Sequence, residues 1–150
     1  MATLLVVHHT VSPPLAELFD AVLAGARDDG IEGVEVVCRA ALSATASDVL
    51  AADGYLLGTP ANLGYMSGAL KHFFDTIYYP CLAETVGRPF GYWVHGNNDT
   101  TGAQRSIEAV TTGLQWRLVA TPLLVTGALD REVDHAAYEL GGTVAATIAD

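Results

Sequence analysis

The sequence has little charge, little cysteine and no long apolar run, and each shortage excludes a class of protein. Charged residues make up 16% of the 150 residues and hydrophobic residues 51%, a composition typical of globular chains and not of disordered ones. No apolar run approaches the roughly eighteen residues that cross a membrane, so we expect no transmembrane helix. The opening residues 1–7 lack a basic region and a cleavage site, which favours a first strand and a cytoplasmic protein.

Several kinds of functional site are also missing. Cys38 and Cys81 are too few for a disulfide framework or a zinc site, and we expect no metal centre. The chain has neither the Gly-x-Ser-x-Gly elbow of hydrolases nor the glycine-rich loop with lysine that binds nucleoside triphosphates. Its 17 acidic residues against 7 basic ones give a net charge of −10, which argues against nucleic acid and anionic membranes as partners and suits a basic redox protein.

What the chain does have is a regular alternation of strand and helix patterns. Short apolar runs without polar alternation are typical of strands buried on both faces. They span residues 3–7, 34–37, 55–57, 90–94 and 118–125. Helix-period segments lie between them or after them, at residues 15–26, 66–77, 107–114 and 133–148. Ser47 could cap a further short helix through Leu50, and Pro122 is expected at an edge, a bulge or a break of the last strand. The alternation predicts one domain over residues 1–150 with a doubly wound parallel sheet.

Three polar loops follow predicted strands, and the first, residues 8–15, leads directly into a helix. It contains the hydroxyls of Thr10 and Ser12, and the N-terminus of the following helix offers unpaired amides to a phosphate. Pro13 and Pro14 remove two amide donors but suit the first turn of a helix. The donors expected to remain are the amides of Val11, Ser12, Leu15 and Ala16. An ordinary capped helix start is the alternative interpretation.

The second loop, Thr59–Tyr65, is expected between a strand that ends at Gly58 and a helix that begins near Met66. Asn62 can donate to and accept from the edge of a ring, and Tyr65 can stack on a flat one. The alternative here is a plain turn between a strand and a helix.

The third loop, predicted over Trp93–Gly102, is rich in turn-forming residues. Its asparagines and threonines supply polar groups, and Asp99 is expected to face solvent or a hydroxyl of a ligand. A helix capped by Thr100 or Thr101 would explain the same residues without a ligand.

The second loop resembles the flavin-binding loop of flavodoxin-like quinone reductases. That loop reads Gly-Thr-Pro, then a variable stretch with Gly, then Met and a helix of small residues, and Gly58-Thr59-Pro60, Gly64 and Met66 match it. The chain departs from the family at Pro13 and Pro14, which replace a glycine and its polar neighbour. It departs also at Leu63 and Tyr65 in the second loop.

The resemblance covers nearly the whole chain. It implies a flavodoxin-like three-layer α/β/α sandwich with a five-stranded parallel sheet in the order 2-1-3-4-5, in which the three loops are neighbours. It also implies that these loops bind FMN non-covalently. The residues implied in cofactor binding are His9, Thr10, Val11, Ser12, Pro13, Pro14, Leu15, Thr59, Pro60, Ala61, Asn62, Leu63, Gly64, Tyr65, His95, Gly96, Asn97, Asn98, Thr100, Thr101 and Gly102.

The same resemblance implies an NAD(P)H-dependent reductase of quinones or similar small acceptors. The flavin would carry the chemistry, with backbone amides around Asn62–Gly64 polarising its ring and His95 as a candidate donor to a substrate carbonyl. Two alternatives stay open. An electron carrier that docks to a redox protein fits the net charge of −10, and a flavin-free interaction module fits the two prolines of the first loop. Members of this family range from monomers to homo-oligomers.

Overall fold

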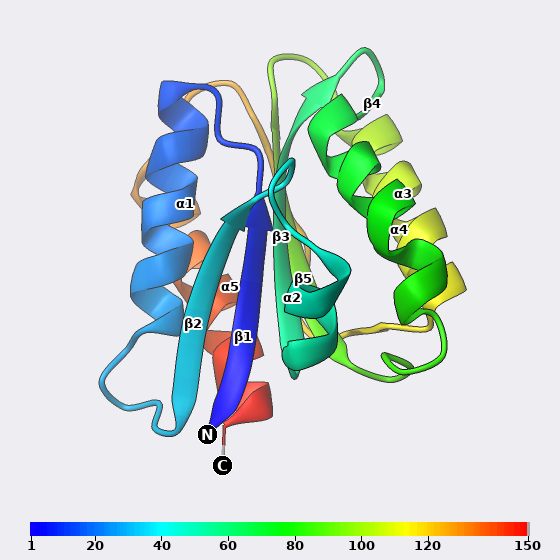
Figure 1. The fold of residues 1–150 in the computed structure, drawn as a ribbon. Coiled ribbons are helices and arrows are strands. Elements are labelled where there is room, and N and C mark those ends of the chain that lie inside the picture. The colour runs from blue at the N-terminus through cyan, green and yellow to red at the C-terminus, as the bar shows by residue number, and fades with distance from the viewer. Residues whose placement is uncertain (150) are drawn as a thin grey trace.

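The computed structural model of the chain describes residues 1–149, in which helices cover both faces of a central sheet (Figure 1). The elements in chain order are β1 (Ala2–His8), α1 (Pro13–Ala26), β2 (Val34–Ala40), α2 (Ala46–Ala51), β3 (Gly54–Asn62), β4 (Tyr65–Met66), α3 (Gly68–Cys81), β5 (Pro89–Gly96), α4 (Thr101–Leu114), β6 (Arg117–Leu118), β7 (Leu123–Thr126) and α5 (Arg131–Ile148). The three-layer α/β/α sandwich predicted from the sequence is confirmed.

The sheet runs in the order β2-β1-β3-β5-β6, with β7 also paired to β5 and β4 paired to β3. All pairs are parallel except β3 with β4. Helices α1 and α5 pack on one face, and α2, α3 and α4 on the other (Figure 1). Because β1, β3 and β5 are adjacent, the loops at their carboxyl ends meet at one edge of the sheet, the upper edge in Figure 1.

The expected count of five strands is wrong, since the sheet contains seven. The predicted edge strand over residues 118–125 is divided into β6 and β7, which pair with opposite ends of β5. Pro122 lies in the gap, where its missing N–H does not interrupt a ladder, as expected for a proline near a strand break. The other additional strand, β4, belongs to the second loop.

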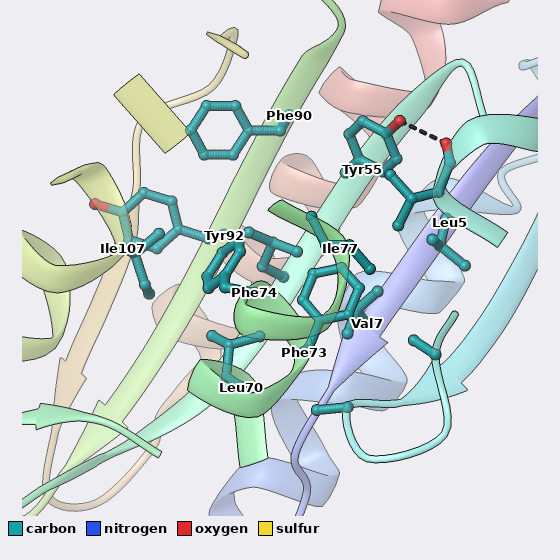
Figure 2. Close-up of a cluster of buried hydrophobic side chains, with 14 of the residues drawn as sticks. Leu5, Val7, Tyr55, Leu70, Phe73, Phe74, Ile77, Phe90, Tyr92 and Ile107 are labelled. Carbon is teal, nitrogen blue, oxygen red and sulfur yellow. Dashed lines mark hydrogen bonds between the residues drawn. The ribbon is translucent and has the colours of Figure 1, made fainter. Parts of the chain in front are cut away.

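A hydrophobic core lies on each face of the sheet, and these two cores explain the apolar runs of the sequence. Every residue of β5 is buried, and so are the first seven of the nine residues of β3, because helices cover both sides of these central strands. Figure 2 shows α3 placing Leu70, Phe73 and Phe74 against the sheet, on the helical face predicted from the sequence. Met66, predicted on the same helix, is buried as well but belongs to β4.

The predicted cap of the short helix α2 is wrong by two positions. Thr45, and not Ser47, is its N-cap: the Thr45 hydroxyl accepts a hydrogen bond from the Asp48 amide at 3.2 Å. The Asp48 carboxylate in turn accepts from the Thr45 amide at 2.9 Å, which completes a capping box. Ser47 is an exposed residue inside the helix.

No helix within residues 1–149 is long and apolar enough to span a bilayer.

Candidate functional site

A cavity of about 250 Å³ lies where the three loops meet at the carboxyl edge of the sheet. All ten residues that line it were predicted as cofactor-binding residues from the sequence. They are Val11, Ser12, Pro14, Leu15, Pro60, Ala61, Asn62, His95, Gly96 and Asn97. The topology brings them together because the strands that precede the three loops are hydrogen-bonded neighbours.

The first loop leads into a capped helix, and several amides that precede the helix have no hydrogen-bond partner within residues 1–149. Ser12 is the N-cap of α1, and its hydroxyl accepts from the Leu15 amide at 3.4 Å. The Ala16 amide donates to the Ser12 carbonyl at 3.0 Å, so neither of these amides is available, contrary to expectation. The amides of Thr10, Val11 and Ser12 have no hydrogen-bond partner within residues 1–149 and are the donors that remain.

Pro13 and Pro14 occupy the first two positions of α1, where an amide would have no partner inside the helix. Their fixed φ suits the first helical turn. Because prolines have no N–H, the free amides belong to the residues before the helix and not to its first two positions.

The histidines at the end of β1, His8 and His9, differ in how their side chains are bonded. The imidazole Nδ1 of His8 lies 2.8 Å from the Thr10 hydroxyl, and its ring stacks on Phe19 at 4.1 Å. Burial lowers the pKa of His8, and the neighbouring His9 lowers it further. The His9 amide donates to the Gly58 carbonyl at 2.9 Å. Its Nδ1 is buried without a partner in the described part of the chain, so this ring retains an unused polar atom.

The second loop is a β-hairpin, which corrects the sequence prediction. Strand β3 continues four residues past Gly58 to Asn62 and pairs antiparallel with β4. Leu63 and Gly64 form the turn with positive φ values of 50° and 74°. The next helix begins at Gly68, after Met66.

Thr59 supports this hairpin and does not reach the cavity. The Thr59 side chain is buried, donates to the Pro60 carbonyl at 2.8 Å and accepts from the Ser67 amide at 3.0 Å. The Thr59 side chain therefore links β3 to the start of α3. At the tip, the Leu63 side chain is fully exposed and Tyr65 is 41% exposed.

The hairpin rests on α4. The Met66 amide donates to the Ser106 hydroxyl at 3.2 Å. Gly102 lies directly beneath the Gly64 carbonyl, and a Cβ atom at position 102 would overlap that oxygen. Gly102, predicted as a cofactor contact, instead supports the hairpin that forms one wall of the cavity.

The third loop is shorter than expected because β5 continues through Gly96. The Asp99 carboxylate accepts from the amide and the hydroxyl of Thr101 at 2.9 and 2.8 Å, and these bonds lower the pKa of Asp99. Thr100 occupies the N-cap position of α4 but makes no side-chain capping bond. Asp99 is exposed, in agreement with the expectation that it faces solvent. Asn97 is the member of this loop that lines the cavity beyond the strand.

His95 is 7% exposed and contacts a residue that the sequence interpretation missed. Its Nε2 lies 2.7 Å from the carbonyl of Gly127, whose amide donates to Gly96 at 3.0 Å. Gly127 follows β7 at the same edge of the sheet, and its place in the fold, after the last strand, is the signal that could have identified it. The expected role of His95 as a donor to a substrate would have to use its other nitrogen, Nδ1.

The remaining predicted residues lie around the cavity without lining it: His9, Thr10, Pro13, Thr59, Leu63, Gly64, Tyr65, Asn98, Thr100, Thr101 and Gly102. A larger hollow of about 520 Å³ lies away from the three loops, between α5 and the gap separating β6 from β7. Glu139 is the one titratable side chain among the residues that line it, and none of these residues belongs to the three loops. Among residues 1–149, no three His, Cys, Asp or Glu side chains converge on a metal position.

Comparison with known proteins extends the description of the fold. No protein-family model matches the chain. A flavodoxin of Aquifex aeolicus (strain VF5) is 34% identical to it over 103 residues, which cover 65% of this chain and 55% of that protein. The chain thus spans about half the length of this curated relative.

Solved structures match over almost the full length. A flavodoxin from the domain Archaea has a TM-score of 0.81 at 14% identity, with 97% of this chain and 98% of that chain covered. A flavodoxin of Streptococcus pneumoniae TIGR4 has a TM-score of 0.79 at 18% identity, with 98% and 100% covered. A WrbA-like flavodoxin protein of Agrobacterium tumefaciens has a TM-score of 0.77 at 19% identity, with 99% and 98% covered. The chain has the flavodoxin-like fold.

Proposed function

We propose that this chain binds FMN non-covalently in the cavity between its three loops and uses the flavin for redox chemistry. The observation that carries the proposal is the cavity itself, which is lined by residues from all three loops and lies beside the N-terminus of α1. The similarity to flavodoxins supports the same assignment.

The residues present fit a phosphate-bearing cofactor. The three unpaired amides of Thr10, Val11 and Ser12 precede α1, where the helix dipole favours an anion. No Asp or Glu is among the residues that line the cavity, so no lining carboxylate repels the phosphate. Gly96 presents no side chain to the cavity. A Cβ atom at this position would lie 3.0 Å from the Cβ of Ala61, so the wall has little room for a larger residue.

FMN, when bound, supplies reversible hydride and electron transfer. The protein binds and orients it. The free amides of the first loop would hold its phosphate, and the side-chain amides of Asn62 and Asn97 can donate to and accept from its polar edges. His95 and Gly96 of β5 line the cavity and are buried, so water has little access from that side.

For the electron donor and acceptor, we propose NAD(P)H and a quinone-like small molecule. The third loop, Asn97–Thr101, contributes no aromatic ring that would cover the flavin, and this favours access by a small hydride donor. Three large apolar side chains are exposed at the tips of the first two loops, Val11, Leu63 and Tyr65, and they suit contact with a flat apolar acceptor.

An electron carrier is the second candidate function. The 34% identity to a flavodoxin and the net charge of −10 favour it, because an acidic protein docks readily to a basic redox partner. In this case the exposed apolar side chains would contact the partner protein.

The first test is titration of FMN with the purified protein, followed by flavin fluorescence, with riboflavin as the control. We expect strong quenching by the protein for FMN and much weaker binding of riboflavin, which lacks the phosphate. Unchanged fluorescence for both would overturn the flavin assignment and favour an interaction module.

The second test separates the two redox functions. The FMN-loaded protein is mixed with NADH or NADPH and a soluble benzoquinone, and nicotinamide oxidation is followed by absorbance. Turnover well above that of free FMN supports the reductase. Loading without turnover, together with electron exchange with a basic redox protein, supports the carrier.

A further inference from the structure

His95 is the titratable side chain of the cavity. None of the other nine lining residues carries an acidic, basic or imidazole group. An imidazole changes its charge between pH 5 and 8 more readily than any other side chain. A cavity that accepts an anion and contains one histidine therefore has one lining group able to adjust its charge to the ligand.

The hydrogen bond to Gly127 determines which nitrogen of His95 is free. A carbonyl oxygen only accepts, so the 2.7 Å contact requires that Nε2 carries the hydrogen. In the neutral ring, Nδ1 is then an acceptor. Nδ1 has no hydrogen-bond partner within residues 1–149. Because it is not one of the buried atoms that lack a partner there, it is accessible to solvent. Because the side chain is 7% exposed and lines the cavity, the open approach to Nδ1 is from the cavity.

Few other titratable side chains lie near the end of β5, where His95 is located. The neighbouring ends of the strands, Pro60–Asn62 on β3 and Leu123–Thr126 on β7, carry no titratable side chain. The end of β1 contributes His8, which bonds to the Thr10 hydroxyl, and the loop after it contributes His9, which does not line the cavity.

The carboxylates of the neighbouring loops and helices interact with groups other than His95. Asp99 accepts two hydrogen bonds from Thr101, and Asp130 caps α5 by accepting from the Val133 amide at 2.9 Å. Glu17 on α1 interacts with Asp134 on α5, which raises the pKa of Glu17. No Lys or Arg is among the residues that line the cavity.

We propose that His95 takes up a proton when FMN enters the cavity, and that the protonated ring offsets the cofactor's negative charge through Nδ1 while Nε2 stays bonded to Gly127. The proton comes from solvent and returns to it when FMN dissociates, so no other reactant is required. This inference rests on the proposed binding of FMN. It makes His95 a binding residue whose contribution depends on pH.

The test is calorimetric titration of FMN into the wild-type protein and His95→Gln at pH 6.5 and 7.5, in two buffers of different ionisation enthalpy. Glutamine keeps an N–H that can reach the Gly127 carbonyl but cannot gain a proton. The wild-type protein should take up on the order of half a proton more per FMN than the variant. When the pH is raised from 6.5 to 7.5, the affinity of the wild-type protein for FMN should fall about threefold more than that of the variant.

His135→Gln is the matched control, since His135 lies on α5 with a side chain 74% exposed. It should take up protons as the wild type does. The FMN phosphate also titrates in every variant, so the difference from the wild type reports the proton on His95 together with any change that its charge causes at the phosphate. If His95→Gln does not fold, His95→Asn is measured against the same criterion.

Equal proton uptake by the wild type and a folded His95 variant would overturn the role of His95 and leave FMN binding intact. Failure of the wild type to bind FMN would overturn both proposals, and the fluorescence titration detects that case independently.

Discussion

At the scale of single residues, two positions in or beneath the hairpin show what the cavity requires of the backbone. Gly102 lies against the Gly64 carbonyl, which leaves no room for a side chain. Leu63 has a φ of 50°, a conformation that costs an L-residue other than Asn, Asp or Gly roughly 1–2 kcal/mol. One residue is thus a glycine for lack of space, and the other is a leucine at a position that glycine or asparagine would fit better.

Gly102→Ala should destabilise the protein by about 1–3 kcal/mol, although alanine is a better helix former than glycine by about 1 kcal/mol. The clash with a backbone oxygen outweighs helix propensity and displaces the hairpin. Urea denaturation would measure the change in the free energy of unfolding, and the FMN titration should show at least tenfold weaker binding.

Gly68→Ala is the matched control, because Gly68 begins α3 and no atom lies within 4 Å of a Cβ placed there. It should be neutral or stabilising. A Gly102→Ala protein as stable as the Gly68→Ala protein would contradict the packing described between α4 and the hairpin.

Leu63→Asn should stabilise the protein by about 0.5–1 kcal/mol, since asparagine tolerates the left-handed conformation and the exposed leucine buries nothing that would be lost. The midpoint of urea unfolding should rise with an unchanged slope. Gly64→Ala, at a φ of 74°, should lower it. A drop in the midpoint for Leu63→Asn would show that the leucine makes a stabilising contact.

At the scale of elements, the helix α2 shows that local patterns can place a cap wrongly. Thr45 and Ser47 are both reasonable caps by residue type, but only Thr45 has an acidic residue three positions later that completes a capping box. Thr45→Ala should cost about 1 kcal/mol of unfolding free energy, whereas Ser47→Ala should change it by less than about 0.5 kcal/mol. Thermal or urea denaturation compares the two, and equal losses would contradict the assignment.

The strands β3 and β7 show which features of the sheet could be predicted from the sequence and which could not. The buried runs identified the strands because both faces of the central sheet are covered. The hairpin was not predicted, because Leu63-Gly64 is not the usual Asn-Gly turn and its antiparallel pairing depends on support from α4. The gap between β6 and β7 was only suggested by Pro122, because the pairing on either side depends on tertiary contacts.

At the scale of the whole molecule, the main electrostatic feature is a net charge of −10. The ion pairs between side chains lie at the surface, such as Arg39 with Asp48 at 3.6 Å, and contribute little. Self-repulsion among the acidic residues should therefore outweigh attraction. Raising NaCl from about 20 to about 300 mM at pH 7.5 should increase the free energy of unfolding by roughly 0.5–1.5 kcal/mol.

Urea denaturation at several salt concentrations checks this, and the effect should vanish near the sequence pI of about 4.6. A protein whose stability fell with added salt at pH 7.5 would instead depend on its surface ion pairs.

At this largest scale the arrangement of the site was the most predictable part. Ten predicted residues line one cavity, because strand order alone decides which loops meet. The position of each polar group was less predictable. Whether the amide of Leu15 was available depended on the rotamer of Ser12, and the free nitrogen of His95 depended on Gly127, 32 residues away in sequence.

The free donors of the first loop belong to the main chain, and this has a consequence for how the protein tolerates mutation. Replacing the side chain of Val11 by any residue other than proline leaves its N–H in place. The main-chain anion site proposed for this loop can persist while the residue types of the loop change, so loop geometry is a better guide to distant relatives than a residue pattern. For the same reason, an engineer who wished to change the ligand would have to alter the length or path of the first loop.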